Sequence, residues 1–173
     1  MPVRFETHLI LFHHIVINYR IILTREEMTA TNAYLKQIKG ITFAGKTNSN
    51  HWITIDGPED FGGSNAGIRP KELVLIALAG CTSSDVVSIL QKKRVELDDY
   101  EVNISAEMCD EHPKVYTKIN LEFVFYGENI NEKDVERAIE LSETKYCSVS
   151  AMLNKSVEIN HSYKIVKPEF AEV

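Results

Sequence analysis

The sequence predicts a single α+β domain in the element order ββαββαβ, with antiparallel strands packed around one central buried helix. One observation behind this prediction is a helical stretch at 70–94 whose first half carries no charge between Leu73 and Cys81. The others are two neighbouring runs of alternating apolar residues and a last such run at 157–166, after a second helical stretch. A chain of 173 residues is long enough to bury a core as one domain.

We assign residues 28–173 to this domain and treat residues 1–27 as an N-terminal extension of doubtful status. The apolar stretch from Leu9 to Leu23 is interrupted by polar side chains, whereas a membrane-spanning helix needs roughly 20 largely apolar residues. It also lacks the basic start and clean apolar middle of a signal peptide, so targeting is the lesser alternative. We expect no membrane association, and Met28 is a plausible first residue.

Two short strands are expected first, at 33–44 and 51–56, joined by a turn rich in Asn and Ser. The glycine-rich segment 57–67 that follows is expected to be a mobile loop. Pro70 then opens the central helix, because proline is favoured in the first turn. Since Leu73 to Cys81 is apolar on every side, we expect this half of the helix to be buried all round.

The second half of the chain predicts an antiparallel hairpin, a helix and a final strand. A turn at 110–113 separates the two alternating runs, and Asn131 is a candidate cap for the next helix. That helix is expected to break at 144–146 and to restart at Cys147. The apolar positions of the hairpin are Val102, Ile104, Ala106 and Met108 in one strand and Val115, Ile119, Leu121, Phe123 and Phe125 in the other.

Composition narrows the class of protein. The net charge of −6 without a basic face argues against nucleic acid as a partner. Three cysteines without a CxxC pair form neither a secreted disulfide framework nor a zinc-finger pattern, which favours a reducing, cytoplasmic compartment. The histidines do not form a ligand set, and we expect neither a metal nor another cofactor.

Two of the cysteines stand at positions that suit redox chemistry. Cys81 ends the apolar half of the central helix, and Cys147 stands where the second helix restarts, near backbone N–H groups that stabilise a thiolate. If the two thiols meet, they can form and break a disulfide. Cys81 is the candidate nucleophile, although its own helix offers no cation to lower its pKa, so the activating group must come from elsewhere. Small-residue packing is the alternative for both, and Cys109, on a polar strand face, is expected to be a bystander.

From about residue 33 to 166 the chain resembles the OsmC-like family, which includes organic hydroperoxide resistance proteins, and it is most similar to the YhfA-type branch. The resemblance rests on five segments: Gly40-Ile41-Thr42-Phe43-Ala44-Gly45, Asp56-Gly57-Pro58, Pro70-Lys71-Glu72-Leu73 through Gly80-Cys81, Asp85-Val86-Val87-Ser88-Ile89-Leu90, and Lys145-Tyr146-Cys147-Ser148-Val149.

The resemblance implies an intertwined homodimer, with the central helices packed together and two sites at the subunit interface. It also implies peroxidase chemistry on an organic hydroperoxide, as part of oxidative stress defence. The Cys81 thiolate would attack the peroxide bond and become a sulfenic acid. Cys147 would then form the disulfide, which a small or lipoyl-type dithiol would reduce.

Two positions depart from the peroxidase pattern. No arginine lies between Arg25 and Arg69, so Lys46 and His51 are the basic candidates in the first hairpin. The glutamate expected directly after the proline is replaced by lysine, and Glu72, one position later, becomes the candidate catalytic carboxylate, although helical spacing points it away from Cys81. A dimeric thiol module that binds electrophiles or senses oxidants without turnover is therefore the alternative. A cysteine hydrolase is a weaker one, because no histidine is linked to either thiol.

Overall fold

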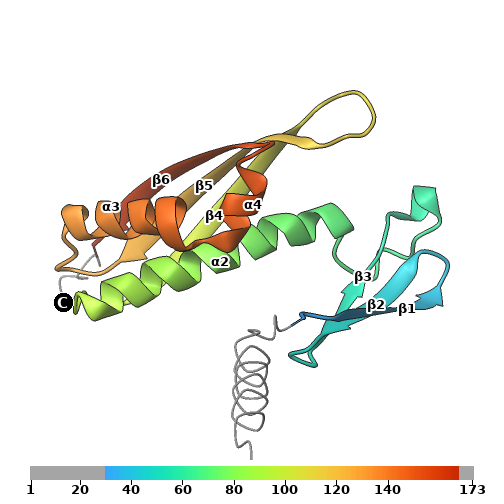
Figure 1. Ribbon diagram of the computed structural model, residues 1–173, viewed down its shortest axis with the longest axis horizontal. Coiled ribbons are helices and arrows are strands. Elements are labelled where there is room, and N and C mark those ends of the chain that lie inside the picture. The colour runs from blue at the N-terminus through green and yellow to red at the C-terminus, as the bar shows by residue number, and fades with distance from the viewer. Residues whose placement is uncertain (1–29, 168–173) are drawn as a thin grey trace, which may run out of the picture.

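The computed structural model describes residues 30–167 and confirms the α+β class, with two three-stranded sheets and their helices. In Figure 1, helices α2, α3 and α4 lie on one face of the sheet formed by β4, β5 and β6, and the smaller sheet of β1, β2 and β3 lies beyond the N-terminal end of α2. The expectations for residues 1–27, and for 28–29 and 168–173 of the domain, fall outside the described residues. The elements are β1 (Ala33–Lys39), β2 (Thr42–Thr47), β3 (Trp52–Ile55), η1 (Glu59–Phe61), α2 (Pro70–Lys92), β4 (Asp99–Met108), β5 (Tyr116–Tyr126), α3 (Glu132–Leu141), the π-helical turn η2 (Ser142–Tyr146), α4 (Ser148–Leu153) and β6 (Glu158–Val166).

The first sheet corrects one expectation. The stretch 33–44 is not one strand but the hairpin of β1 and β2, which pair antiparallel through a turn at Gly40. Gly40 has φ +55°, a left-handed conformation that favours glycine, and a Cβ there would meet the carbonyl oxygen of Gly62 at 2.9 Å. The single glycine therefore divides a segment whose apolar content alone favours a continuous strand.

The loop between β3 and α2 is organised around one buried carboxylate. Asp56 is 1% exposed and accepts hydrogen bonds from the backbone N–H groups of Gly57 (2.7 Å), Ser64 (3.0 Å) and Ala66 (3.0 Å). These bonds, that from Ala66 foremost, hold the pKa of the Asp56 carboxyl below its ordinary value. The glycine-rich loop is therefore tied to the end of β3, and it brings the chain to Pro70 at the start of α2.

Helix α2 is the central helix, but it is not buried all round in the single chain. Its fully buried side chains recur every four residues along one face: Leu78, Thr82, Val86 and Leu90. Ile76, in the apolar half, is 52% exposed, so the expectation for Leu73 to Cys81 is wrong for one chain by itself. The helix is long and apolar enough to cross a membrane, but one such helix among the described residues is weak evidence, because the core helix of a soluble protein passes the same test.

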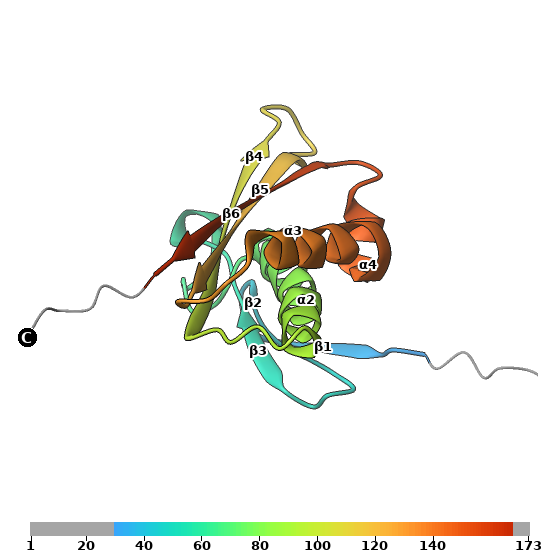
Figure 2. The same cartoon turned by 90° about the vertical axis from the view of Figure 1, so that its left-hand side faces the viewer.

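The second sheet contains the predicted hairpin, with β4 and β5 antiparallel. Two expected apolar positions are wrong: Met108 follows a register shift and is 50% exposed, and Val115 precedes β5 and is 53% exposed. Strand β6 pairs parallel to β5, which corrects the expectation of a wholly antiparallel arrangement. The helical connection through α3, η2 and α4 explains this direction, because such a crossover carries the chain back to the end of the sheet where β5 began. Figure 2 shows α2 and α3 covering the same face of this sheet.

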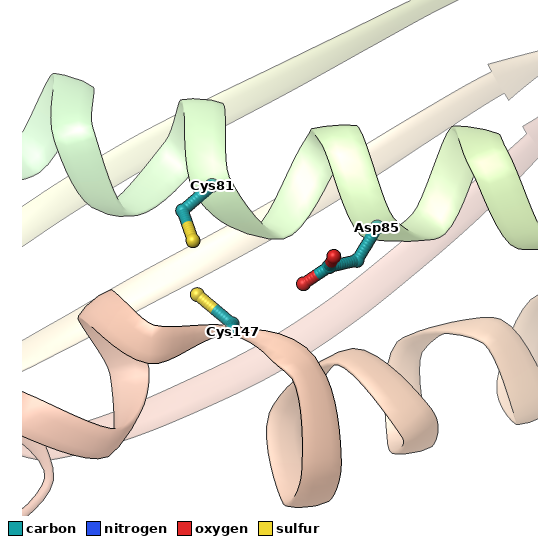
Figure 3. Close-up of side chains that lie close together, drawn as sticks. All are labelled: Cys81, Asp85 and Cys147. Carbon is teal, nitrogen blue, oxygen red and sulfur yellow. The ribbon is translucent and has the colours of Figure 1, made fainter. Parts of the chain in front are cut away.

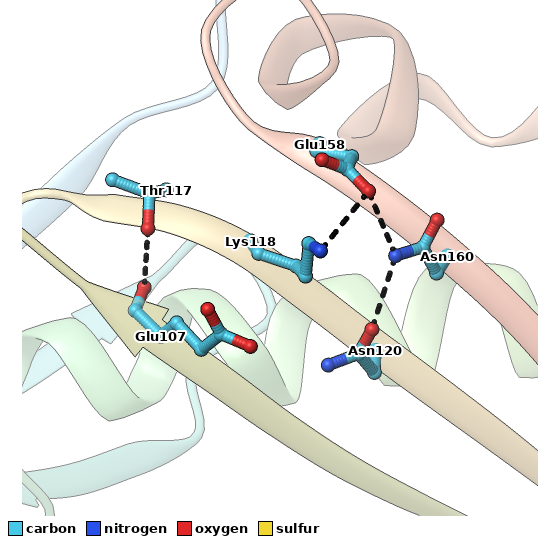
Figure 4. Close-up of polar contacts among 6 residues, drawn as sticks. All are labelled: Glu107, Thr117, Lys118, Asn120, Glu158 and Asn160. Atoms are coloured by element: carbon cyan, nitrogen blue, oxygen red, sulfur yellow. Dashed lines mark hydrogen bonds and ion pairs between the residues drawn. The ribbon is translucent and has the colours of Figure 1, made fainter.

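The other face of the second sheet is polar, as the alternation predicts. Lys118 of β5 and Glu158 of β6 form an ion pair of 3.4 Å, and the Asn160 amide donates to the Asn120 side chain at 3.1 Å (Figure 4). On the covered face, the side chains of Ile119, Leu121, Phe123 and Phe125 are at most 1% exposed and form the core with the buried face of α2. The sheet therefore separates a solvated face from a single apolar core.

His161 of β6 is a buried histidine whose charge is unfavourable in the folded state. Its side chain is 8% exposed and stacks on Phe123, with 6.0 Å between ring centroids. Burial lowers the pKa of His161 below its ordinary value and outweighs the opposing effect of Glu143, whose carboxylate lies 3.5 Å from Nδ1. The folded protein therefore binds this proton less readily than the unfolded chain does.

We expect His161 to lower the free energy of unfolding at acidic pH. Its contribution is complete above the unfolded pKa of about 6.5 and is lost as pH falls through the lower folded pKa. Urea unfolding of the wild type should give a smaller free energy at about pH 5 than at about pH 7.5, and His161→Gln should shrink that difference. His112→Gln, in an exposed turn, is the control and should leave it unchanged. An equal pH dependence in the His161→Gln variant would contradict this assignment.

Candidate active site

The fold brings Cys81 and Cys147 together. Cys81 projects from α2, and Cys147 projects from the junction between η2 and α4. Their Sγ atoms and a carboxylate oxygen of Asp85 all lie within 4.8 Å of one another, and Figure 3 shows the three side chains converging. Both thiols are free in the structure. The proximity on which the redox interpretation depends is therefore present within a single chain.

A change of helix type positions Cys147. After α3, the chain makes the π-helical turn η2, which the N–H of Cys147 closes with a 2.9 Å hydrogen bond to the Ser142 carbonyl. Cys147 then takes extended backbone angles, and its Sγ accepts a hydrogen bond of 3.3 Å from the N–H of Ser150 as the cap of α4. The predicted break and restart are thus both observed. Such π turns occur frequently at functional sites.

The structure shifts the pKa values of the two thiols in opposite directions. Burial raises the pKa of Cys81, but hydrogen bonds from the backbone of Val149, the thiol of Cys147 and Ser148 more than offset it, and the pKa lies below its ordinary value. Burial raises the pKa of Cys147. The hydrogen bonds from Ser150 lower it by less than burial raises it, so this pKa lies above its ordinary value. Cys81 is therefore the better nucleophile, and Cys147 keeps its proton.

The start of α4 does donate to Cys147, as the sequence predicts, through the Ser150 N–H, but burial of this thiol outweighs that bond. The first residues of α4 also direct the Val149 N–H and the Ser148 hydroxyl, 4.0 Å from Sγ, to Cys81, where the pKa is lowered. Cys81 lacks an activating group on its own helix, and α4 supplies one from across the fold.

Glu72 does not reach the thiol pair within the chain. It stands nine positions before Cys81 on α2, about 13 Å along the axis at 1.5 Å per residue. Its carboxylate accepts a hydrogen bond of 3.0 Å from the N–H of Arg69 and so caps the start of the helix. In the single chain its role is structural.

Asp85 is the carboxylate that the structure places beside the thiols. It follows Cys81 by four residues on α2, so the two side chains share one face of the helix. Its Oδ2 accepts a hydrogen bond of 3.1 Å from the hydroxyl of Ser142, which is fully buried. The sequence singled out Asp85 only as part of a family segment, although its four-residue spacing from Cys81 was a signal for this placement.

None of the basic candidates from the first hairpin acts on Cys81 in the described chain. No cation is among the causes of the lowered pKa of Cys81. Lys46 instead donates to the Asn50 side chain at 2.9 Å and lies over the Trp52 ring. Two thiols and one carboxylate are donor types that also occur in zinc sites, but the unequal acidities of the thiols fit a redox pair more closely.

Cys109 lies apart from this pair. It follows β4, in the turn of the hairpin, where its Sγ accepts a hydrogen bond of 3.3 Å from the N–H of Val115. Its thiol also contacts the carbonyls of Glu111 and Pro113, each at 3.3 Å. Cys109 therefore lies in the turn and not on the strand face that the sequence predicted, and its role as a bystander stays a prediction.

The α+β fold and the two facing thiols define a class of small proteins with a cysteine pair between a central helix and the helical crossover. Comparison with known proteins identifies the class. A family model described as OsmC-like protein matches residues 62–162, and the chain belongs to this family. Protein YhfA of Escherichia coli strain K12 is 44% identical over 137 residues, which cover 78% of this chain and 97% of YhfA.

Solved structures agree with this assignment. A hypothetical protein from Aquifex aeolicus VF5 is 33% identical with a TM-score of 0.72, covering 82% of this chain and 100% of that one. An organic hydroperoxide resistance protein OsmC from Legionella pneumophila has a TM-score of 0.61 at 16% identity, covering 80% of this chain and 99% of that one, and it shows the shared fold. The name of YhfA states no activity.

Proposed function

We propose that the protein is a thiol-dependent peroxidase for organic hydroperoxides, with Cys81 as the nucleophile and Cys147 as the resolving cysteine. The observation that carries this proposal is the facing pair of thiols, of which Cys81 has the lowered pKa and the adjacent Cys147 the raised one. Thiolate character selects the atom that attacks, and a neighbouring thiol completes the cycle. The organic hydroperoxide resistance proteins of the same fold support this reaction class.

The cycle has three steps. The Cys81 thiolate attacks one peroxide oxygen, the O–O bond breaks, and the leaving alkoxide takes up a proton, which gives an alcohol and a sulfenic acid on Cys81. The Cys147 sulfur then attacks the Cys81 sulfur, and the sulfenic hydroxyl leaves with a proton as water. An external dithiol reduces the resulting disulfide by exchange, which returns both thiols and leaves the dithiol oxidised.

The surroundings of Cys81 favour an alkyl or lipid hydroperoxide over hydrogen peroxide. Cys81 packs against the apolar core and is partly exposed, so a substrate can reach it along apolar surface. Tyr146, which precedes Cys147 in the chain, is 50% exposed and carries an apolar ring. Burying an alkyl chain on such side chains adds to binding, by about 0.8 kcal/mol for each CH₂ group.

Intact-mass analysis of the reduced protein tests the proposal. After one equivalent of cumene hydroperoxide, we expect rapid loss of two hydrogens, reversed by a dithiol and repeated over many turnovers. Peptide mapping should place the disulfide between Cys81 and Cys147. Slow addition of oxygen without a disulfide and without turnover would contradict the proposal.

One observation favours a second candidate, a thiol module that captures electrophiles or senses oxidants without turnover. In residues 30–167 no cation lowers the pKa of Cys81, and the charge of Asp85 raises it. A thiolate supported only by neutral hydrogen-bond donors is a modest catalyst. The mass experiment separates the candidates, because a module is modified once and does not turn over.

The homodimer is also part of this proposal, because sheet β1–β3 lacks a core within the chain. It packs extensively against none of the other described helices and strands. Its side chains Tyr34, Leu35, Ile38, Trp52 and Ile53 are between 44% and 61% exposed. A second copy of the chain would bury this surface together with the exposed apolar positions of α2, and family members typically form dimers.

We expect light scattering to give a particle of about 39 kDa, twice the chain mass of 19.7 kDa, at micromolar concentration. The exposed apolar surface of a lone chain is too large for a stable monomer. Leu35→Glu, in sheet β1–β3, should shift the mass toward that of the monomer, while Glu107→Lys, on the polar face of the other sheet, should not. A wild-type particle of 19.7 kDa would count against the dimer.

A reducing, cytoplasmic location completes the proposal. All three cysteines are free, and a resting state with reduced thiols is the one that attacks peroxides. The small or lipoyl-type dithiol that the cycle requires also belongs to such a compartment.

A further inference from the structure

We propose that Asp85 accepts the proton of the Cys147 thiol when the disulfide forms and returns it to the departing hydroxyl as water. This inference rests on the proposed function and assigns its proton-transfer step. It places the working carboxylate after the nucleophile on α2, not before it at Glu72.

The geometry supports this assignment. A carboxylate oxygen of Asp85 lies within 4.8 Å of both sulfur atoms, which allows transfer through one intervening water or after a small side-chain adjustment. Figure 3 shows the carboxylate directed toward the gap between the sulfurs. Glu72, by contrast, is held at the start of α2 by the N–H of Arg69.

The second step needs a base at this position. Cys147 is 2% exposed, so bulk water has little access to its proton. Its pKa is raised, by burial first and by the neighbouring Cys81, which leaves it as a thiol at neutral pH. Among the described His, Cys, Asp and Glu residues, the cluster whose side-chain ligand atoms lie within 4.8 Å of one another consists of Cys81, Cys147 and Asp85. Asp85 is the only carboxylate among these three groups.

Ser142 fixes the carboxylate for this role. Its hydroxyl donates to Oδ2 of Asp85 at 3.1 Å, and the same hydroxyl lies 3.5 Å from the carbonyl oxygen of Thr82. Ser142 belongs to η2, the turn that also positions Cys147. The π turn therefore places the resolving thiol and orients its proton acceptor at the same time.

The protons and electrons of the step balance within the site. The carboxylate takes the proton of Cys147, the thiolate electron pair forms the bond to the Cys81 sulfur, and the S–O bond breaks. The hydroxyl leaves with the electron pair of the S–O bond and receives the proton from the Asp85 carboxyl. The products are the disulfide, one water and the original carboxylate.

Asp85→Asn is expected to make the Cys81 thiol more acidic and, at the same time, to slow closure of the disulfide. Removing its charge should lower the pKa of Cys81, because that charge raises it now, and alkylation of Cys81 should persist to lower pH. Closure of the disulfide should slow by about 10²-fold, because the general base is lost. Raising the pH through the pKa of Cys147 should restore the closure rate, which a purely structural role would not produce.

The closure step can be measured without a peroxide. An aromatic disulfide, dithiobis-nitrobenzoate, caps the Cys81 thiolate and releases one coloured nitrothiobenzoate. Attack by Cys147 then expels a second one, and the rate of this second release gives the closure rate. We expect slow release from Asp85→Asn and an intermediate rate from Ser142→Ala. Asp110→Asn, an exposed carboxylate in the hairpin turn, should match the wild type.

Unchanged release from Asp85→Asn at neutral pH would overturn the inference, and so would slow release that higher pH fails to restore. The assay is independent of the peroxidase proposal. A wild type that releases nitrothiobenzoate rapidly but consumes no hydroperoxide would refute the proposed function and leave the role of Asp85 standing.

Discussion

Cys81→Ser is expected to abolish hydroperoxide consumption, with a loss of about 10³-fold or more, because loss of a nucleophile removes the reaction path. The hydroxyl of serine stays protonated at neutral pH, and the donors that lower the pKa of Cys81, from Val149 and Ser148, are too weak to ionise it. Consumption of cumene hydroperoxide in the presence of a dithiol measures this loss.

Cys109→Ser is the matched control for that variant. It also replaces one partly buried thiol, but in the hairpin turn and away from the pair. It should consume hydroperoxide as the wild type does, and urea unfolding of both variants should show that each is folded. If Cys109→Ser alone is inactive while Cys81→Ser turns over, the proposed thiol pairing is wrong.

The parts of the fold that depend on local chemistry could be predicted from the sequence. The hairpin of β4 and β5 follows from strict alternation, and the Asn131 cap follows from its side chain, which accepts a hydrogen bond from the N–H of Lys133 at 3.0 Å. The restart of the helix at Cys147 was also expected. In each case the residues that decide the structure are neighbours in the sequence.

The features of the fold that depend on contacts between residues far apart in the chain could not be predicted from the sequence. The parallel direction of β6 is set by the length and path of the crossover, which alternation does not encode. The turn at Gly40 depends on a conformation open to glycine and on its approach to Gly62. The acidity of Cys81 depends on α4, which begins 67 residues later in the chain.

In the candidate site, too, the features set by local sequence could be predicted and those set by distant residues could not. Cys81 and Cys147 were recognised from their positions, and the structure brings them together. Their unequal acidity and the role of Asp85 required the packing of α2 against η2 and α4. Glu72 was selected by its place near a family motif, whereas in the chain it caps its own helix.

Cys147→Ser is expected to separate the first oxidation from the second step. Serine is a favoured helix cap, so its hydroxyl can replace the sulfur that now accepts from the N–H of Ser150, and it can still donate to Cys81. The fold of α4 and the lowered pKa of Cys81 should therefore survive, and one equivalent of hydroperoxide should be consumed at close to the wild-type rate.

Without a resolving thiol, the sulfenic acid on Cys81 has no partner inside the site. We expect turnover to fall by about 10²-fold or more and a sulfenic acid to accumulate that a dimedone probe captures. Excess hydroperoxide should then oxidise it to a sulfinic acid that a dithiol does not reverse. If instead the variant turns over normally, an external thiol resolves the sulfenic acid directly. Cys147 would then serve to keep Cys81 acidic through its hydrogen bond, and the disulfide would not be part of the cycle.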